Sequence, residues 1–244
     1  MKRHWKTFLS MCLSVSIILS MSTAVFATPT NVSGGGSTNV SGGGNSSSSG
    51  GGHNNNRQPD EEPFDDVTRG DWYYDDVVYV YKNELMAGTS ENLFSPHAPL
   101  TRGMTAAILY RYAGSPNVDY EPIFTDVPDG QWYTDGVMWA VQEGIMVGYG
   151  DNTCGPEDSV KLEQLAAILY RYAGSPDVDV DEDKVLSEFP GGTDVTPYAE
   201  DAMQWALQND MIYGNSMLPT AGATRAQAAK MFAVFAQMED TSEA

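Results

Sequence analysis

The chain has 244 residues, of which 41% are hydrophobic, and carries a formal net charge of −20. Nucleic acid and anionic lipid are poor partners for so acidic a protein, because like charges repel. Of the two cysteines, only Cys154 lies outside the N-terminal leader, so no disulfide framework can replace a hydrophobic core. Stability must therefore come from packing.

Residues 1–27 have the pattern of a secretory signal peptide. A positive end with Lys2, Arg3 and Lys6 precedes a largely apolar run, and small residues lead up to Ala27. We expect cleavage after Ala27, so that the chain contacts the membrane only in transit. A retained anchor is the alternative, since the run approaches the ~20 residues that span a bilayer.

Residues 28–60 form a segment of Gly, Ser and Asn with almost no apolar side chain. The sequence NVSGGG occurs in it twice, at 31–36 and 39–44. Such a composition cannot bury enough surface to offset the entropy of ordering. We expect a disordered tether.

The rest of the chain is repetitive. The segment AAILYRYAGSP occupies 106–116 and, unchanged, 166–176. The same offset of 60 residues pairs Trp72 with Trp132 and Asp66 with Asp126. A third copy is recognisable after gaps are allowed, with Thr224-Arg225 opposite Thr101-Arg102. The sequence therefore predicts repeats at 63–118, 123–178 and 189–238.

Two helices are expected in each copy. The first candidate covers 72–87, where Val78, Tyr81 and Leu85 recur at spacings of three and four. The second begins after Thr101 as N-cap and ends before Gly114-Ser115-Pro116. Two short helices cannot close a core alone, so we expect an all-α fold of three helix-loop-helix repeats packed with pseudo-threefold symmetry.

The combined motifs resemble those of the S-layer homology (SLH) domain family. The resemblance rests on FDDV…WYYD…FSPHAPLTRGMTAAILYRY, FTDV…WYTDGVMWAVQEGIMVGYGDNTCGPEDS and TDVTPYAEDAMQWALQNDMIYGN…TRAQAAKMF. It implies three modules in one helical domain, whose inter-repeat grooves hold the secondary cell-wall polysaccharide of Gram-positive-type envelopes, often through a pyruvylated sugar. It also implies a secreted, wall-attached protein that binds non-covalently.

Arg102 and Arg225 are the first candidates for glycan binding. Each follows a helix-starting threonine, Thr101 or Thr224, so we expect its guanidinium to lie beside free backbone N–H groups and to favour a carboxylate. The resemblance implies the same role. The alternative is that these arginines pair with acidic residues of a neighbouring copy, namely Asp66, Asp126 or Asp194.

The second copy departs from this pattern. Lys161-Leu162 stands where the first copy has Thr101-Arg102, so a planar guanidinium is replaced by a point charge one position earlier. We expect the groove at this copy to be weak or silent. Lys161 remains a candidate for a weak contact with the glycan.

The aromatic residues divide into two groups. Trp72, Trp132 and Tyr198 occupy one position of the repeat and either stack on a sugar or fill a gap between helices. A second group has core spacing, and its members are Trp139, Trp205, Tyr110, Tyr112, Tyr170 and Tyr172. We expect Arg111 and Arg171, between these tyrosines, to be solvated.

The three repeated aspartates, Asp66, Asp126 and Asp194, come just before the first helix of each copy. Their spacing favours helix capping or a salt bridge over contact with a ligand. The resemblance, however, implies that this aspartate helps to line the groove.

Several other features argue against catalysis. We expect Cys154 to be a small buried hydrophobe, because Phe94 and Met217 fill its position in the other copies. No triad includes His97, and the acidic run at 177–183 lacks the glycine of a calcium loop. We expect no enzyme activity and no cofactor. The alternatives are a surface scaffold that contacts other proteins and a secreted glycan hydrolase.

Overall fold

The computed structural model describes residues 62–181 and 183–242, which belong to the compact unit that begins at Glu62. The expected signal peptide at 1–27 and tether at 28–60 lie outside the described residues. The described part consists of helices and loops without strands, in agreement with the expected all-α class. None of its helices has the length and hydropathy needed to cross a membrane.

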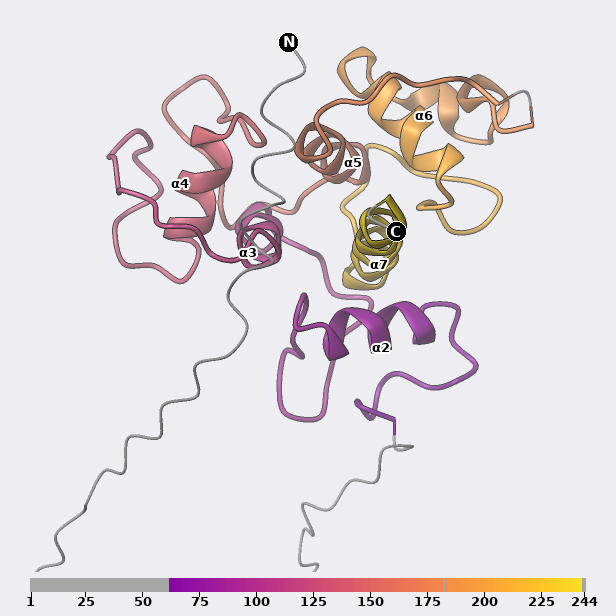
Figure 1. The fold of residues 1–244 in the computed structure, drawn as a ribbon, viewed down its shortest axis with the longest axis horizontal. Helices are drawn as coiled ribbons and strands as arrows, with labels where there is room; N and C mark the ends of the chain where they lie inside the picture. Colours follow the sequence, from indigo (N-terminus) through magenta and orange to yellow (C-terminus); the bar gives the residue numbers. More distant parts are fainter. Residues whose placement is uncertain (1–61, 182, 243–244) are drawn as a thin grey trace, which may run out of the picture. The chain divides into compact units, whose positions relative to one another are not determined.

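In this described part, six α-helices pack in pairs. They are α2 (Tyr74–Lys82), α3 (Arg102–Tyr112), α4 (Thr134–Gln142), α5 (Leu162–Tyr172), α6 (Glu200–Gln208) and α7 (Arg225–Ser242). Three short 3-10 turns, η2 (Leu186–Glu188), η3 (Gly192–Asp194) and η4 (Pro197–Ala199), precede α6. Helix α4 packs on α3, α6 packs on α5, and α2 packs on α7, which is the helix farthest from it in sequence. In Figure 1, α3, α5 and α7 lie at the centre and α2, α4 and α6 lie around them.

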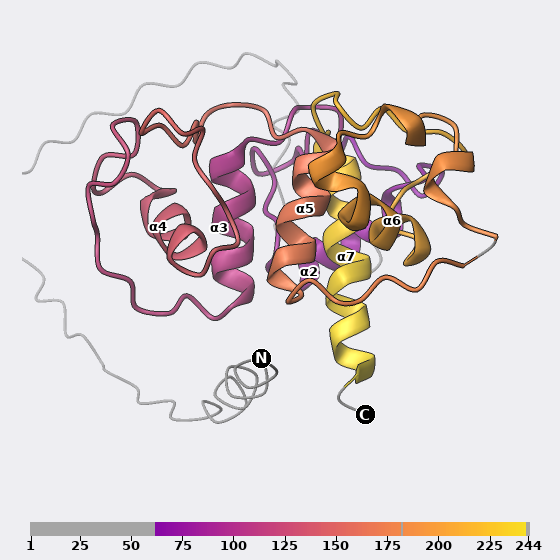
Figure 2. The same cartoon turned by 90° about the horizontal axis from the view of Figure 1, so that it is seen from above.

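The central helices are tied together at both ends. Before they begin, three backbone hydrogen bonds form a closed ring: Leu100 N–H to Ala223 C=O at 2.9 Å, Val160 N–H to Leu100 C=O at 2.9 Å, and Ala223 N–H to Val160 C=O at 2.8 Å. Farther along, the rings of Tyr112, Tyr172 and Phe235 meet pairwise at 5.7–5.9 Å. Figure 2 shows the three helices side by side, with α7 extending beyond the other two.

The first helix of the first copy is shorter than the sequence predicts. Helix α2 ends at Lys82 rather than Ala87, because the chain turns at Glu84, whose φ is 58°. The predicted face is right in part: Leu85 is buried, although it lies beyond the end of the helix, whereas Tyr81 is exposed. The buried residues of α2 itself are Val77 and Val80. Nearly every position from 77 to 81 is apolar, so the spacing alone did not distinguish the two faces.

The second helix of this copy is confirmed. The Thr101 hydroxyl accepts a hydrogen bond from Met104 N–H at 3.2 Å, which satisfies one free donor of the first turn. Helix α3 ends at Tyr112, and Gly114 and Ser115 then take positive φ values of 81° and 50°. Such conformations prevent the helix from continuing.

The expected core residues lie inside or against the core. Trp139 and Trp205 are each 6% exposed, and Cys154 is fully buried, as predicted. Tyr110, Tyr112, Tyr170 and Tyr172 are half-buried and pack against this core. The hydroxyl groups of Tyr110 and Tyr170 donate to the carbonyls of Pro116 and Pro176, so each ring also secures the loop after its helix.

Candidate ligand-binding grooves

Arg225 holds a loop that is more than one hundred positions away in sequence. At the start of α7, its Nε donates to the Phe94 carbonyl at 2.8 Å and its Nη2 to the Ala87 carbonyl at 2.6 Å. The guanidinium carbon lies 4.5 Å from the centre of the Phe94 ring. Burial lowers the pKa of Arg225, and the nearby negative charge of Asp66 acts in the opposite direction.

Arg102 makes the same kind of contact with the next loop. Its Nε donates to the Cys154 carbonyl at 2.8 Å, and its Nη2 donates to the Val147 carbonyl at 2.7 Å. The guanidinium carbon lies 4.7 Å from the centre of the Tyr149 ring. Arg102 and Arg225 are only 4% and 7% exposed, so both belong to the folded framework. Arg225 also lines a groove beside this framework.

The backbone donors expected to lie free beside these arginines are already bonded. Arg102 N–H and Gly103 N–H donate to the carbonyls of Asp158 and Pro156, and the corresponding groups at the start of α7 donate to Ala98 and Pro96. The alternative of a salt bridge is also wrong, because within the described residues neither arginine forms an ion pair with Asp66, Asp126 or Asp194. What the protein leaves unbonded in this part of the chain is Nη1 of each guanidinium.

Two of the three aspartates hold loops rather than helix ends or cations. The Asp66 carboxylate accepts the N–H groups of Phe94 and Ser95, both at 2.8 Å. Asp126 accepts those of Cys154 and Gly155 at 2.8 and 2.7 Å. Helix capping and salt bridging are therefore the wrong interpretation for these two residues, because the carboxylates reach across to a loop that folds back on the same copy.

Asp194 differs from the other two aspartates. It lies exposed in η3, and the loop of its copy is held instead by a backbone hydrogen bond from Met217 N–H to the Pro190 carbonyl at 2.9 Å. The third copy aligns with the other two only when gaps are allowed, and it is also the copy whose loop is held by the backbone instead of an aspartate.

The first groove, called here the Arg225 groove, has a volume of about 550 Å³. It brings Arg225 of α7 together with Arg111 of α3, Asp135 of α4 and Trp132, which lies just before α4. Trp132 is 59% exposed, which agrees with a ligand platform rather than a core plug. Arg111, expected to be solvated, is exposed but also donates to the Leu85 carbonyl at 3.1 Å. The only sequence signal that marked Arg111 was the presence of an equivalent arginine, Arg171, in the second copy.

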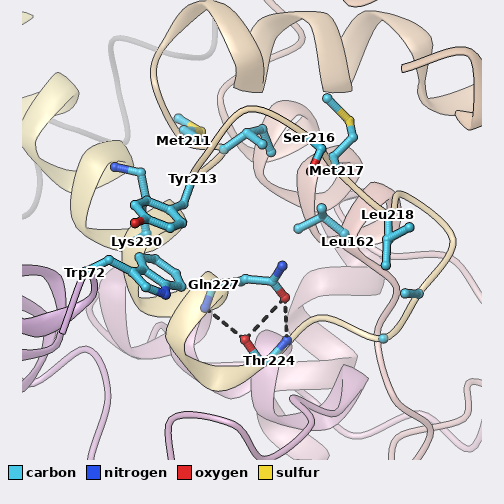
Figure 3. A pocket seen from close by; sticks show the side chains of 13 residues that line it. Trp72, Leu162, Met211, Tyr213, Ser216, Met217, Leu218, Thr224, Gln227 and Lys230 are labelled. Atoms are coloured by element: carbon cyan, nitrogen blue, oxygen red, sulfur yellow. Dashed lines mark hydrogen bonds between the residues drawn. The ribbon is translucent and has the colours of Figure 1, made fainter. Parts of the chain in front are cut away.

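The second groove, called here the Leu162 groove, has a volume of about 330 Å³. Leu162 borders it in place of an arginine, together with Trp72, Tyr213, Thr224 and Lys230, as Figure 3 shows. The rings of Trp72 and Tyr213 are stacked, with centroids 4.0 Å apart and planes 9° from parallel. Sequence reasoning identified Trp72 and Thr224 but missed the other aromatic ring and the lysine.

Tyr198 is tied to a buried carboxylate that sequence reasoning also missed. Its hydroxyl donates to Glu163 Oε1 at 3.2 Å, and Thr196 donates to Oε2 through its N–H at 3.1 Å and its hydroxyl at 2.8 Å. Burial, reinforced by the negative charge of Glu163, raises the pKa of Tyr198. Lys161 is 3.9 Å from this carboxylate and borders neither groove.

Glu163 stands where the first copy has Gly103, and the exchange has a steric reason. A Cβ at Gly103 would lie 3.2 Å from Cβ of Tyr133 and 2.8 Å from the Pro156 carbonyl oxygen. In the third copy Ala199 replaces the tyrosine, and the larger Glu163 side chain is accommodated next to η4. The replacement of Gly103 by Glu163 at equivalent positions of the repeat was the sequence signal that could have identified Glu163.

Burial raises the pKa of the Cys154 thiol, whose sulfur lies 3.9 Å from Arg102 Nη2. Within residues 62–181 and 183–239, no three His, Cys, Asp or Glu side chains gather as a metal site requires.

Comparison with known proteins identifies two segments of the chain. Residues 63–103 and 123–166 match the S-layer homology domain, whereas no such match covers the third predicted copy. The first two predicted repeats therefore contain SLH segments.

Similar proteins include enzymes and surface proteins. An endoglucanase of Bacillus sp. (strain KSM-635) is 26% identical over 69% of this chain and 18% of its own length. The S-layer protein sap of Bacillus anthracis is 25% identical over 70% and 21%. A cellulosome-anchoring protein of Acetivibrio thermocellus is 25% identical over 44% and 25%. The chain thus spans a quarter or less of each of these relatives.

Proposed function

We propose that this protein attaches non-covalently to the bacterial cell wall by binding an anionic secondary cell-wall polysaccharide. The SLH segments and the similarity to an S-layer protein and a cellulosome-anchoring protein support attachment at the cell surface. The observation that carries the glycan assignment is the presence of Arg225, Arg111 and Trp132 in the lining of one groove.

The chemistry of the Arg225 groove suits a sugar that bears a carboxylate, such as a pyruvyl ketal. Nη1 of Arg225 can donate to the carboxylate while Nε and Nη2 remain bonded to the loop, so the cation is positioned before the ligand arrives. Arg111 adds a second positive charge at the same groove. The exposed ring of Trp132 offers an apolar face on which a sugar ring can stack.

A second anionic site follows from the same reasoning at Arg102. Tyr198 takes the place of Trp132 there, and the charge of Arg171 acts on its hydroxyl, as expected if both face one groove. Thr101, Thr224, Asp66 and Asp126 act by positioning the helix starts and the loops. Asp194 and Lys161 line neither groove, so neither is proposed to contact the glycan. The groove beside Leu162 binds acidic sugar weakly or not at all.

We also infer that the domain contains three copies of one module, related by a pseudo-threefold axis along the central helices. The closed hydrogen-bond ring and the three-ring aromatic cluster support this arrangement. In this account residues 1–27 direct secretion, and residues 28–60 link the domain flexibly to its surroundings.

Sedimentation with purified cell walls tests the assignment. The protein should sediment with walls that carry the secondary polysaccharide and stay in solution when the polysaccharide has been extracted. Trp132→Ala should weaken sedimentation, whereas Ile123→Ala, which removes another exposed apolar side chain outside both grooves, should not. Equal sedimentation with extracted walls would refute the proposal.

The alternatives give different results in the same experiment. A scaffold that acts through its acidic surface would sediment only when other surface proteins are present on the walls. A glycan hydrolase, the less favoured alternative, would release reducing sugar from the walls over time.

A further inference from the structure

The two grooves occupy corresponding positions of the repeat but differ in chemistry. Trp72 in one corresponds to Trp132 in the other at the offset of 60, and Leu162 corresponds to Arg102, the position that Arg225 fills in the third copy. The Leu162 groove therefore keeps the aromatic side chain and lacks the guanidinium. An exposed leucine, Leu218, and the ring of Tyr213 add further apolar surface to it.

We propose that the Leu162 groove is a second carbohydrate site, which takes an uncharged sugar residue. It adds to the proposed function a separate ligand class, and it does not depend on the anionic site. Figure 3 shows Trp72 and Tyr213 on one side of the groove and Leu162 and Leu218 on the other.

The aromatic pair provides the contact surface. Trp72 and Tyr213 are stacked at 4.0 Å, so each ring fixes the orientation of the other before a ligand binds. Tyr213 is 51% exposed, and both rings border the cavity. A sugar ring presents C–H groups on one face, and the partly negative face of an aromatic ring attracts them.

The charges of the groove favour a neutral ligand over an acidic one. Lys230 is its only basic lining residue in the described part of the chain. The charge of Lys230 acts on a carboxylate of the neighbouring helix α2. Burial raises the pKa of that residue, Asp76, and the positive charge of Lys230 lowers it, so the two charges lie within mutual influence. Lys230 also lacks the planar fork that holds a carboxylate through two hydrogen bonds.

The polar rim can satisfy sugar hydroxyl groups. Gln227 accepts the N–H of Thr224 through Oε1 at 2.9 Å, which directs its side-chain amide into a fixed position at the floor of the groove. Ser216 lines the same cavity. Hydroxyl groups bond to such neutral donors and acceptors without the desolvation cost of a charge. A volume of about 330 Å³ is at the small end of ligand pockets, which fits one ring rather than an extended chain.

Indole signals in nuclear magnetic resonance spectra separate the two grooves. The ¹⁵N-labelled chain is titrated with two neutral probes, N,N′-diacetylchitobiose and wall polysaccharide whose ketal-linked acids have been removed by mild acid. Untreated acidic polysaccharide serves as the comparison. Trp72→Phe and Trp132→Phe assign the two indole N–H signals.

We expect a neutral probe to shift the Trp72 signal at millimolar concentration and to leave the Trp132 signal in place. Tyr213→Ala should weaken this binding about three- to tenfold, the range for one aromatic contact. Lys230→Gln should leave it within about twofold, since the bound sugar carries no charge.

Two results would overturn the proposal. One is a Trp72 signal that does not shift when either neutral probe is added up to ~50 mM. Binding weaker than this would not count as specific. The other is a Trp72 signal that moves only with acidic polysaccharide and no longer moves in Lys230→Gln, which would make the groove an anion site. Failure of the anionic function is read separately, from a Trp132 signal that the acidic polysaccharide does not shift.

Discussion

Arg225 donates a 2.8 Å hydrogen bond to the Phe94 carbonyl and lies 4.5 Å over the ring of the same residue, 131 positions earlier in the chain. This contact closes the domain, because it fixes the loop of the first copy to the helix of the last. The residue proposed to bind ligand is therefore also a structural residue, and its substitution changes both properties.

Arg225→Ala should lower the free energy of unfolding by about 2–4 kcal/mol, because two loop carbonyls lose their donor. Urea denaturation followed by circular dichroism measures the change. Arg171→Ala is the matched control: it loses one 3.4 Å bond to the Ile145 carbonyl and should cost less than about 1 kcal/mol. Equal costs for the two variants would contradict the framework role of Arg225.

Glu163→Ala should also destabilise the fold, by about 1–3 kcal/mol, since it leaves the N–H and hydroxyl of Thr196 without their acceptor. The contribution of Lys161 should be small, because that side chain is half exposed at 3.9 Å. The exposed Glu157→Ala provides a control for the loss of one negative charge, with an expected change within ~0.5 kcal/mol. Thermal melting of the three proteins checks the order.

Cys154 should react slowly with iodoacetamide in the folded protein. Burial raises the pKa of its thiol above the ordinary value of 9.0, and the charge of Arg102 only partly reverses the shift, so the reactive thiolate is scarce at pH 8. Mass spectrometry of a Cys12→Ser chain follows this one thiol, with urea-unfolded protein as the reference. Equal rates in both states would contradict the burial of Cys154.

Replacement of Cys154 by alanine tests the packing of the same residue. Loss of the buried sulfur should cost about 1 kcal/mol of stability while sedimentation with cell walls is kept. Loss of wall binding in a correctly folded variant would instead assign Cys154 to the ligand site.

Asp76→Asn should stabilise the protein at neutral pH. Because burial raises the pKa of Asp76 in the folded state, its contribution to stability is fully present below the unfolded value of about 3.8 and is lost as the pH rises through the folded pKa. The amide removes the cost of the buried charge, so the melting temperature of the variant should exceed that of the parent at pH 7. The difference should disappear below about pH 3.8; a constant difference across this range would exclude titration of Asp76 as the cause.

The sequence was informative where one residue determines a local conformation. Thr101 was predicted as a helix cap from its hydroxyl, and Trp139 and Trp205 as core from their spacing. The end of α2 was not predicted, because Glu84 adopts a positive φ that its residue type does not signal. Asp66 and Asp126 were misassigned for a related reason: their partners lie 28 and 29 positions later, beyond the reach of local patterns.

The candidate grooves required the three-dimensional arrangement. Arg225, Trp132 and Arg111 lie on three different segments, and repeat spacing says only that their positions are equivalent, not which of them meet. Tyr213 was overlooked because the other copies have Ala87 and Val147 at its position, so nothing in the repeat marks it as aromatic. Its stacking on Trp72 depends on the packing of the last copy against the first.

Titration calorimetry with the secondary wall polysaccharide, before and after mild acid removal of its pyruvyl groups, tests the central claim most directly. If the Arg225 groove holds the carboxylate, removal of the acid should weaken binding at least tenfold, as expected when a charged hydrogen bond of about 1.5–3 kcal/mol is lost. Trp132→Ala should weaken binding of the untreated polymer in the same direction. Equal affinity for the two polymers, with the protein folded in both titrations, would contradict the account.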